Sequence, residues 1–510
     1  MKKLLALILV SALLLTVVTG CAGEKAGGGA TAEVKDTLSI AQQADVTTLD
    51  PHKSVALYDF NIFRMIYNSL LEEDGENLKG VLAKSWNMAD DALSATIEVN
   101  TDALFSNGEA LKASDVAFSF NRALSMPAGQ VVPGIANAEV LDETHVKVNF
   151  VSENPGFFSS LVGFFIVQEA AVVNAGENYG ILDSGTEVGT GPYTLKSRST
   201  GSNIVFEARD DYFEGKPAIQ TVTYQIIGDA NTAYLALQNG QIDFCTLTLP
   251  ATNVAQAEQN DALAVTHFDS RGLAFITMNC NKAPFDNQKV RQAVAYALDK
   301  QNIIDLAEDG MGTVAQSPWN GLTFGYSSDV QGVSQDVEKA KSLLTEAGYT
   351  DGFTVTFKTM EGSWKKVAEA VQAQLAPIGI DIKIEVMDST TAVSTLLQGN
   401  YDIANCSMGL GGDASGWETA FQTKDPNAPS VGALNMFFYS NSDVDRLFKE
   451  ANTTDTTVRL AKYKEIATTL NEEAPIIPLY FQKLHYVHAK NLTISKIDGT
   501  AQFYVDDFHW

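Results

Sequence analysis

The feature that most restricts the fold of this chain is an alternation of strand-like and helix-like segments in its second half. Short runs in which apolar and polar residues alternate are followed by segments with apolar residues at helical spacing. The patterns predict strands at 353–358, 380–386 and 401–405, with helices at 364–375 and 391–397 between them. This order is typical of folds in which helices pack on a largely parallel sheet. We therefore expect this part of the chain to form an α/β lobe.

The first half of the chain has a different pattern of predicted strands and helices, and the pattern changes near Arg271. Its patterns predict strands at 37–41, 96–99, 145–150, 189–195 and 221–227, and helices at 59–71, 114–124 and 230–239. After the change, a strand at 273–279 and helices at 287–298 and 337–347 lead into the alternating part. At 510 residues the chain is long enough for several lobes. The strand-like segment 476–487 is expected to cross back to the first lobe.

The first residues have the pattern of a secretory signal. Lys2 and Lys3 precede the apolar run 4–18, which is shorter than the roughly 20 residues of a membrane-spanning helix. The run ends in Val18-Thr19-Gly20-Cys21, which resembles the lipobox of bacterial lipoproteins. The resemblance implies that Cys21 is acylated and becomes the mature N-terminus; an ordinary signal with a chance cysteine is the alternative. Residues 22–35 lack apolar periodicity and are expected to form a flexible tether.

Charge and cysteine content restrict the function classes. The formal net charge of -27 disfavours nucleic acid as a partner, because phosphates need a basic surface. A cationic or zwitterionic ligand is compatible with this charge, although solubility alone accounts for most of it. Besides Cys21 the chain has Cys245, Cys280 and Cys406, without a CxxC pair. This is not a disulfide scaffold, and whether two of them form one bridge is left open.

Enzymatic motifs are present only in part. Ser363 and Lys366 match the SxxK pattern of penicillin-recognising enzymes, but no KTG motif accompanies them. An extracellular serine acyl enzyme is therefore the alternative from another class. His485 and His488 would point to opposite faces of a strand, so no metal site is expected there. No phosphate-binding loop is complete, so the sequence predicts neither a cofactor nor a catalytic residue.

A series of short motifs runs in order over nearly the whole chain. They are TLDPH at 48–52, LAKSW at 82–86, FSNGEALKASDVAFS at 105–119, GTGPY at 189–193, PFD at 284–286, VRQA at 290–293, LLTEAGY at 343–349 and LAPIGI at 375–380. Any one of them alone would be a weak signal. As an ordered series they resemble solute-binding protein family 5, the oligopeptide-, dipeptide- and nickel-binding proteins of ABC importers.

The resemblance implies an α/β protein of the two-lobe periplasmic-binding type (class II, cluster C) with an extra subdomain in its first lobe. It divides the chain into a lipoprotein signal peptide (1–20), the tether (21–35), lobe 1 (36–271, with the extra subdomain at about 70–182), lobe 2 (272–485) and a return to lobe 1 (486–510). Two crossings between the lobes would form a hinge. Ligand would bind in the cleft and shift the population toward a closed form.

The resemblance also suggests ligand-binding residues. In peptide-binding members a glycine-rich strand end offers its backbone to the ligand and an aspartate pairs with the α-ammonium group. Gly409, Gly411 and Asp413 stand at that place. Glycines allow close approach of a peptide backbone, and a carboxylate in a closed cleft needs a cation; a surface turn capped by Asp413 is the alternative.

Four further residues occupy positions at which relatives line the cleft: Leu57, Trp364, Trp417 and Asn435. The two tryptophans would form apolar walls, with ordinary core packing as an equal alternative. After Asp413 the chain reads Ala414-Ser415-Gly416, where the family has an aromatic residue, an acid and a proline. This departure leaves the peptide specificity open.

The function implied is that of an extracytoplasmic lipoprotein, a non-enzymatic receptor that delivers a small peptide or similar solute to an ABC importer. Its partners would be separate permease and ATPase subunits, and it would be a monomer held to the cell membrane by its lipid alone. A nickel chelate, an oligosaccharide or another small solute is the alternative ligand.

Overall fold

The computed structural model describes residues 35–74, 77–428, 431–499 and 502–510, and for Leu57 and Thr390 the backbone alone. The signal segment, the lipidation candidate Cys21 and nearly all of the tether thus lie outside the described residues. Among the described helices, none combines the length and the apolar character that a membrane crossing requires.

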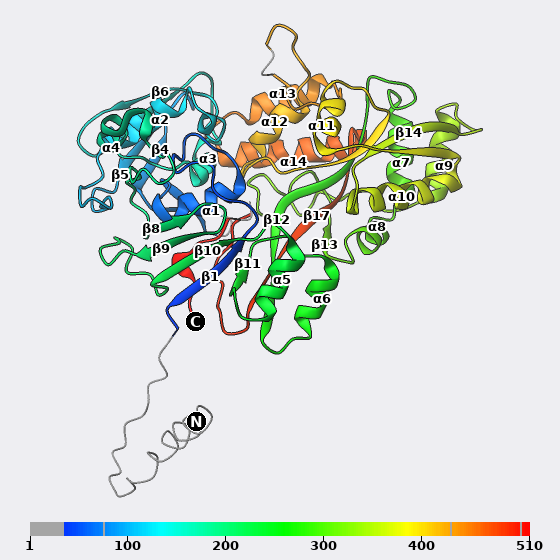
Figure 1. Cartoon of the computed structure of the whole chain (residues 1–510). Coiled ribbons are helices and arrows are strands. Elements are labelled where there is room, and N and C mark those ends of the chain that lie inside the picture. The colour runs from blue at the N-terminus through cyan, green and yellow to red at the C-terminus, as the bar shows by residue number, and fades with distance from the viewer. Residues whose placement is uncertain (1–34, 75–76, 429–430, 500–501) are drawn as a thin grey trace, which may run out of the picture. The chain divides into compact units, whose positions relative to one another are not determined.

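Within the described residues, eleven strands form one mixed sheet (Figure 1). From one edge to the other the order is β15 (Ile380–Val386), β14 (Phe353–Thr359), β16 (Ile403–Met408), β12 (Leu263–Met278), β17 (Ile476–Ala489), β11 (Phe244–Cys245), β1 (Thr37–Gln42), β10 (Thr221–Ile226), β9 (Asn203–Ala208) and β8 (Tyr193–Ser199), and β13 (Gly312–Val314) pairs with β17. Strands from the two halves of the chain therefore meet at β12 and β17.

The strands β12 and β17 are antiparallel and unusually long, with 16 and 14 residues against a usual five or six. Their pairing runs from Leu263 opposite Ala489 to Thr277 opposite Ile476, with a register shift between Asp269 and Leu273. Beyond the shift β12 also pairs with β16, whereas the other end of β17 pairs with β11. The two strands thus lie side by side and connect the two parts of the sheet (Figure 1).

The second half of the chain covers its part of the sheet with helices. They are α7 (Gln288–Ala297), α8 (Lys300–Ala307), α9 (Val337–Glu346), α10 (Ser363–Leu375), α11 (Ser389–Leu397), α12 (Glu418–Phe421), α13 (Ser442–Ala451) and α14 (Thr456–Glu473), with 3₁₀ turns at Ala376–Ile378 (η4) and Ala414–Trp417 (η5). Several begin at an acidic or amide side chain that accepts backbone N–H groups of the first turn, as Asp299, Asp336 and Asp455 do. The local sequence therefore fixes where these helices start.

The first half contains a separate four-stranded antiparallel sheet of β4 (Ala83–Met88), β5 (Ser94–Val99), β7 (His145–Phe150) and β6 (Ile135–Val140), in that order, and the hairpin β2 (Leu71–Asp74) with β3 (Asn77–Gly80). Its helices are α1 (Leu57–Ile66), α2 (Ala113–Ala123), α3 (Phe157–Ser160), α4 (Glu169–Ala175), α5 (Ala230–Gln238) and α6 (Ala251–Glu258), and its short 3₁₀ turns are η1 (Pro127–Gln130), η2 (Leu161–Gly163) and η3 (Gly176–Asn178); a last turn, η6, lies at Val505–Asp507. Alternate residues of β5 and β7 are buried in one core with α2.

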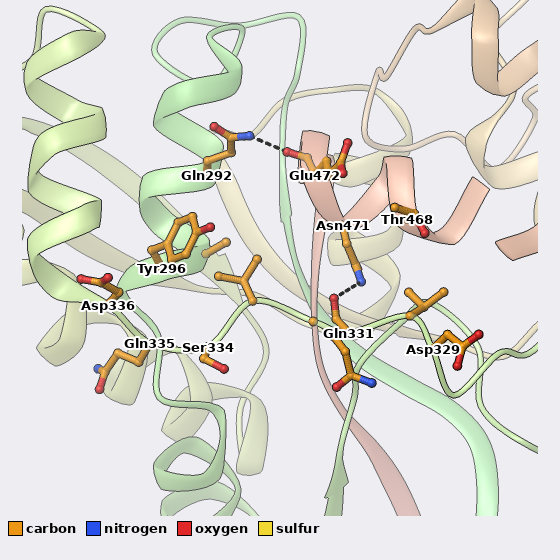
Figure 2. A pocket seen from close by; sticks show the side chains of 14 residues that line it. Gln292, Tyr296, Asp329, Gln331, Ser334, Gln335, Asp336, Thr468, Asn471 and Glu472 are labelled. Atoms are coloured by element: carbon orange, nitrogen blue, oxygen red, sulfur yellow. Dashed lines mark hydrogen bonds between the residues drawn. The ribbon is translucent and has the colours of Figure 1, made fainter. Parts of the chain in front are cut away.

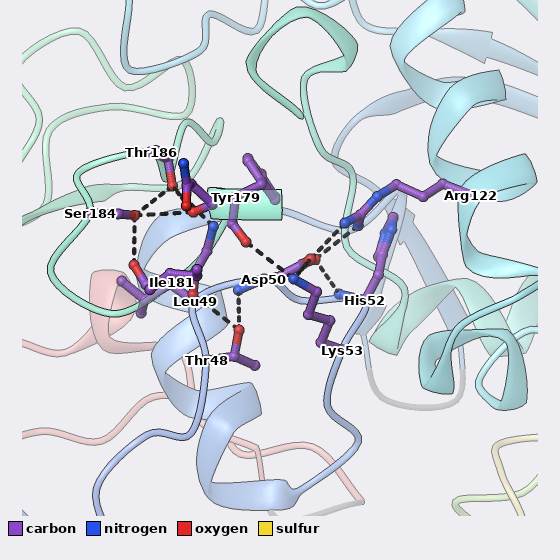
Figure 3. Close-up of polar contacts among 12 residues, drawn as sticks. Thr48, Leu49, Asp50, His52, Lys53, Arg122, Tyr179, Ile181, Ser184 and Thr186 are labelled. Carbon is purple, nitrogen blue, oxygen red and sulfur yellow. Dashed lines mark hydrogen bonds and ion pairs between the residues drawn. The ribbon is translucent and has the colours of Figure 1, made fainter. Parts of the chain in front are cut away.

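A buried ion pair anchors the segment after β1 (Figure 3). Both carboxylate oxygens of Asp50 accept hydrogen bonds from Arg122 of α2, at 2.8 and 2.6 Å. The neighbouring His52 is buried, and its Nε2 lies 3.0 Å from the carbonyl oxygen of Phe165. On the other side, Leu49 donates its N–H to the carbonyl oxygen of Gly180. The TLDPH motif thus holds three distant segments together.

The alternation predicted for residues 353–405 is confirmed, as is the strand near the C-terminus. The helix expected at 59–71 ends earlier, at Ile66, because Tyr67 adopts an extended backbone with φ −124° and ψ 153°. The strand expected from 189 begins only at Tyr193. A Cβ on Gly189 would lie 1.9 Å from the carbonyl oxygen of Ile66, so this glycine serves close backbone packing.

Candidate ligand-binding site

A cavity of about 570 Å³ lies between residues from the two halves of the chain. One wall is formed by Phe60, Glu73 and residues between 153 and 163, and the other by residues between 409 and 419. Arg271, at the register shift of β12, also lines it, as do Gln130, Val131, Pro133, Asn452 and Gln502. A smaller cavity of about 200 Å³ shares several of these residues and extends to Phe324 and Arg459.

The glycine-rich segment follows β16 directly and lines the cavity with Gly409, Gly411 and Gly412. Gly411 has φ +72°, a conformation that favours glycine, and no atom lies within 4 Å of the place where its Cβ would be. Among the described hydrogen bonds outside the strands, none uses the backbone N–H or C=O groups of Gly409, Leu410 or Gly411. Polar main-chain groups are therefore available at the wall of the cavity.

Asp413 follows this segment, but its negative charge is already balanced. Both of its carboxylate oxygens lie 2.7 Å from Nη2 of Arg459, and Oδ1 also accepts the N–H of Ser415. Burial alone would lower the pKa of Arg459, but the Asp413 carboxylate and the Tyr463 hydroxyl raise it above its ordinary value. The Asp413 carboxylate therefore already has a cationic partner within the protein, and its expected contact with a ligand ammonium group stays a prediction.

A second ion pair sits where the chain crosses from one part of the sheet to the other. Arg271 donates from Nη2 to Glu73 at 2.6 Å and from Nε to the carbonyl oxygen of Leu322 at 2.8 Å. Its backbone N–H donates to the carbonyl oxygen of Gly499. Arg271 therefore joins the β2–β3 hairpin, the C-terminal segment and the loop at Leu322 beside the cavity.

Two further carboxylates, Glu418 and Glu153, line the cavity. Glu418, at the start of α12, accepts hydrogen bonds from the side-chain amides of Asn452 and Gln422. Burial raises the pKa of Glu418, against the effect of the Asn452 hydrogen bond. Glu153 lies on the opposite wall and is exposed. Within the described ranges, no lysine, arginine or histidine forms an ion pair with either residue.

The two walls come close together at Gly156. A Cβ built on Gly156 would lie 2.3 Å from Oγ of Ser415 and 3.3 Å from Cγ of Asp413. A side chain at this position would displace the Ser415 hydroxyl, so Gly156 favours this close approach.

The candidates Trp364, Trp417 and Asn435 do not line this cavity. Trp417 is 2 % exposed and stacks on Phe421 in the core, and Asn435 is fully buried, where it binds the backbone of Gln422 and Tyr439. Trp364 is partly buried and packs against the hydrophobic core to which helices α7, α8, α9 and α10 contribute. Trp417 thus follows the alternative of core packing, while ligand contacts of Trp364 and Asn435 stay predictions without support from this cavity. The side chain of Leu57 lies outside what the structure describes.

The acyl-enzyme motif falls on the first turn of α10. Ser363 is the first residue of that helix and Lys366 is exposed. No hydrogen bond between Ser363 and Lys366 occurs among those described for these residues. Ser363 does not belong to the cavity wall described above.

A second cavity of about 570 Å³ lies within the second half, between α7, the loop 329–336 and the end of α14 (Figure 2). Its polar side chains largely bind the backbone of neighbouring segments. Gln292 donates to the carbonyl oxygen of Glu472, and Asn471 donates to those of Gln316 and Gln331. The first contact joins α7 to the end of α14, and the contact with Gln331 holds the loop against α14.

Sequence reasoning missed Glu73, Arg271, Arg459 and Glu418. Each depends on a partner or a cavity wall far away in the chain, such as the 198 residues between Arg271 and Glu73. The only sequence feature that pointed to any of them was the change in the pattern of predicted strands and helices near Arg271.

Comparison with known proteins agrees with this architecture. The profile described as bacterial extracellular solute-binding proteins, family 5, middle, matches residues 77–428. The oligopeptide-binding protein AppA of Bacillus subtilis is 28% identical over 478 residues, which cover 88% of this chain and 87% of AppA. The glutathione-binding protein GsiB of Salmonella typhi is 30% identical over 487 residues, which cover 92% and 93%.

Solved structures give the same result. The ABC transporter substrate-binding protein CtaP of Listeria monocytogenes superposes with a TM-score of 0.83 at 25% identity, covering 94% of this chain and 99% of CtaP. B. subtilis AppA in complex with a nonapeptide gives 0.72 at 26% identity, covering 93% and 99%. These likenesses confirm the expected α/β two-lobe fold. Because the family profile spans most of the chain, the protein belongs to family 5 of the bacterial extracellular solute-binding proteins.

Proposed function

We propose that this protein is the receptor of an ABC importer and captures a peptide or peptide-like solute in the cavity between its two halves. The observation that carries the proposal is the run of available backbone groups at Gly409, Leu410 and Gly411 on the cavity wall. An extended peptide can pair its own backbone with such a segment, as if it were an added strand. The absence of side chains at the glycines permits this approach.

The size and the lining of the cavity support the same ligand class. A volume of about 570 Å³ lies within the range of pockets for small molecules, roughly 300 to 1,000 Å³. Phe60, Val131, Phe157 and Leu410 give it an apolar surface for side chains of differing sequence. Because GsiB is named for glutathione, the family alone does not fix the ligand; a nickel chelate or an oligosaccharide is the alternative.

We further propose that lobe 1 comprises residues 36–271 and 486–510, that lobe 2 comprises 272–485, and that β12 and β17 form the hinge. The register shift between Asp269 and Leu273 interrupts the ladder at this crossing and provides a place to bend. A ligand that contacts both walls stabilises the form in which both are close to it. Its binding therefore shifts the population toward closure.

The lipobox resemblance supports acylation of Cys21, with the tether 22–35 between the membrane and the folded body. The receptor then works as a monomer at the extracytoplasmic face of the cell membrane and passes its ligand to separate permease and ATPase subunits. No chemical step is assigned to it. A penicillin-type acylating probe tests the alternative, since it would modify Ser363 only in an acyl enzyme.

Native mass spectrometry of freshly purified full-length protein tests the proposed ligand class. We expect a co-purified mass that fragments as a peptide, and titration calorimetry with that peptide should give binding heat. Small-angle scattering should show a smaller radius of gyration after saturation. A co-purified metal chelate or sugar, or the lack of any binding heat with a tripeptide library, would contradict the proposal.

A further inference from the structure

The cavity between the two halves of the chain is lined by more acidic than basic residues. Glu73, Asp413, Glu153 and Glu418 are acidic, whereas Arg271 and Arg459, which lines the adjoining smaller cavity, are basic. Each arginine is bound to one of the first two acids, at 2.6 and 2.7 Å. Both positive charges of these walls are therefore balanced by acidic side chains of the protein itself.

Neither arginine is available to a carboxylate of the ligand. The side chains of Arg271 and Arg459 are 6% and 9% exposed, and their partners Glu73 and Asp413 are 14% and 8% exposed. A ligand carboxylate would have to displace one of these partners and leave it buried without a counter-charge. Breaking a buried pair in this way is strongly unfavourable.

Glu418 presents the opposite situation. Its two described hydrogen-bond donors, Asn452 and Gln422, are neutral amides, so they bind the carboxylate without balancing its charge. Burial raises the pKa of Glu418, and the negative charge of Asp445 adds to this effect, so a cation beside the carboxylate would stabilise its ionised form. An ammonium or guanidinium group of a ligand supplies that cation, and Glu153 on the facing wall adds a second negative charge.

We propose that the cavity takes a positively charged solute whose ammonium or guanidinium group binds Glu418, and that it does not hold its ligand through a free carboxylate. This inference rests on the proposed function and adds to it the charge of the ligand and the residue that reads it. The positive group is the amino terminus of a peptide, a basic side chain or a polyamine, which share the same chemistry. The apolar wall around Phe60 and Phe157 accommodates the uncharged part.

Competition binding to the full-length protein tests this inference with an equimolar tripeptide library in free, N-acetylated and C-amidated forms. Acetylation of peptides without a basic side chain should lower capture by about tenfold or more, as expected when a buried charge loses its partner. Acetylated peptides that carry lysine or arginine should keep most of their binding. C-terminal amidation should change capture by less than about twofold, because no carboxylate contact is lost.

Glu418→Gln, which keeps the shape of the side chain, should remove the discrimination between free and acetylated peptides. Glu153→Gln, at an exposed position, should reduce it to a smaller extent. Glu369→Gln, on the exposed face of α10, is the matched control and should behave as wild type. Melting temperatures of all three variants show whether each is folded.

The outcomes separate the inference from the function on which it rests. The inference would be overturned if free peptides and acetylated peptides without a basic side chain were captured equally, or if C-terminal amidation abolished capture. In either case the proposed function as a peptide receptor would stand. Capture of spermidine and agmatine without capture of any tripeptide would support the charge of the ligand and contradict the peptide class. Failure of every probe to bind would overturn both.

Discussion

The contribution of the ion pair between Asp413 and Arg459 to stability can be tested quantitatively. Removing the pair should destabilise the folded protein even without ligand. Asp413→Ala leaves the guanidinium of Arg459 buried, with the ring of Phe324 at 4.6 Å and no carboxylate beside it. Breaking a buried pair from one side costs about 3 to 5 kcal/mol. For a chain of this size the entropy of unfolding is about 1 kcal/mol per kelvin, so the melting temperature should fall by about 3 to 5 °C.

A double-mutant cycle makes this test specific. Arg459→Met keeps an apolar stem against Phe324, and the double variant Asp413→Ala, Arg459→Met should regain most of the stability that the single variant loses. Asp329→Ala, which breaks the exposed pair with Lys464, is the control and should melt close to the wild type. Unfolding is followed by circular dichroism.

The reasoning would be refuted if Asp413→Ala melted with the wild type, or if the double variant lost as much as the two single variants together. The first result would mean that solvent reaches Arg459 and replaces its partner. If the prediction holds, a loss of ligand affinity in Asp413→Ala includes a structural effect and is not a measure of an ammonium contact alone.

Three further predictions concern other parts of the molecule. Burial lowers the pKa of His52 to about 4 from 6.5, so stability should fall by up to about 3 kcal/mol as the pH drops from about 6.5 toward 4, and denaturant unfolding of His52→Gln should show a weaker acid dependence. Gly189→Ala should lower the melting temperature clearly, because its Cβ would meet the carbonyl oxygen of Ile66 at 1.9 Å, whereas Gly228→Ala, with its nearest neighbour at 3.6 Å, should melt near the wild type. Cys21→Ser should move the protein from the membrane fraction to the soluble fraction, and continued membrane association would refute the lipid anchor.

The sequence predicted those parts of the fold that depend on local signals. Strands and helices between 353 and 405 follow from the period of their apolar residues, and the structure places them within a few residues of the expected bounds. The end of the first helix was missed, because Tyr67 continues its apolar pattern while the backbone leaves the helix there. Apolar periodicity alone does not mark a helix end that lacks glycine or proline.

The site could be predicted only in part. The glycine-rich segment has a recognisable composition and lines the cavity, while its contact with ligand stays a prediction. The partner of Asp413 is 46 residues away on α14, so no local pattern reveals that its charge is balanced. Trp417 has the same composition signal whether it lines a cavity or packs in a core, and only the tertiary arrangement assigns it to the core.

The position of β17 has a consequence for how the chain is made. This strand is the last long element in the sequence, yet it lies in the middle of the large sheet between β12 and β11. The sheet cannot be completed until the ribosome has released nearly all of the protein, and the pairing of Leu263 with Ala489 closes a loop of more than two hundred residues. Such late contacts slow folding. The export proposed for this protein requires an unfolded chain, and slow folding would favour it.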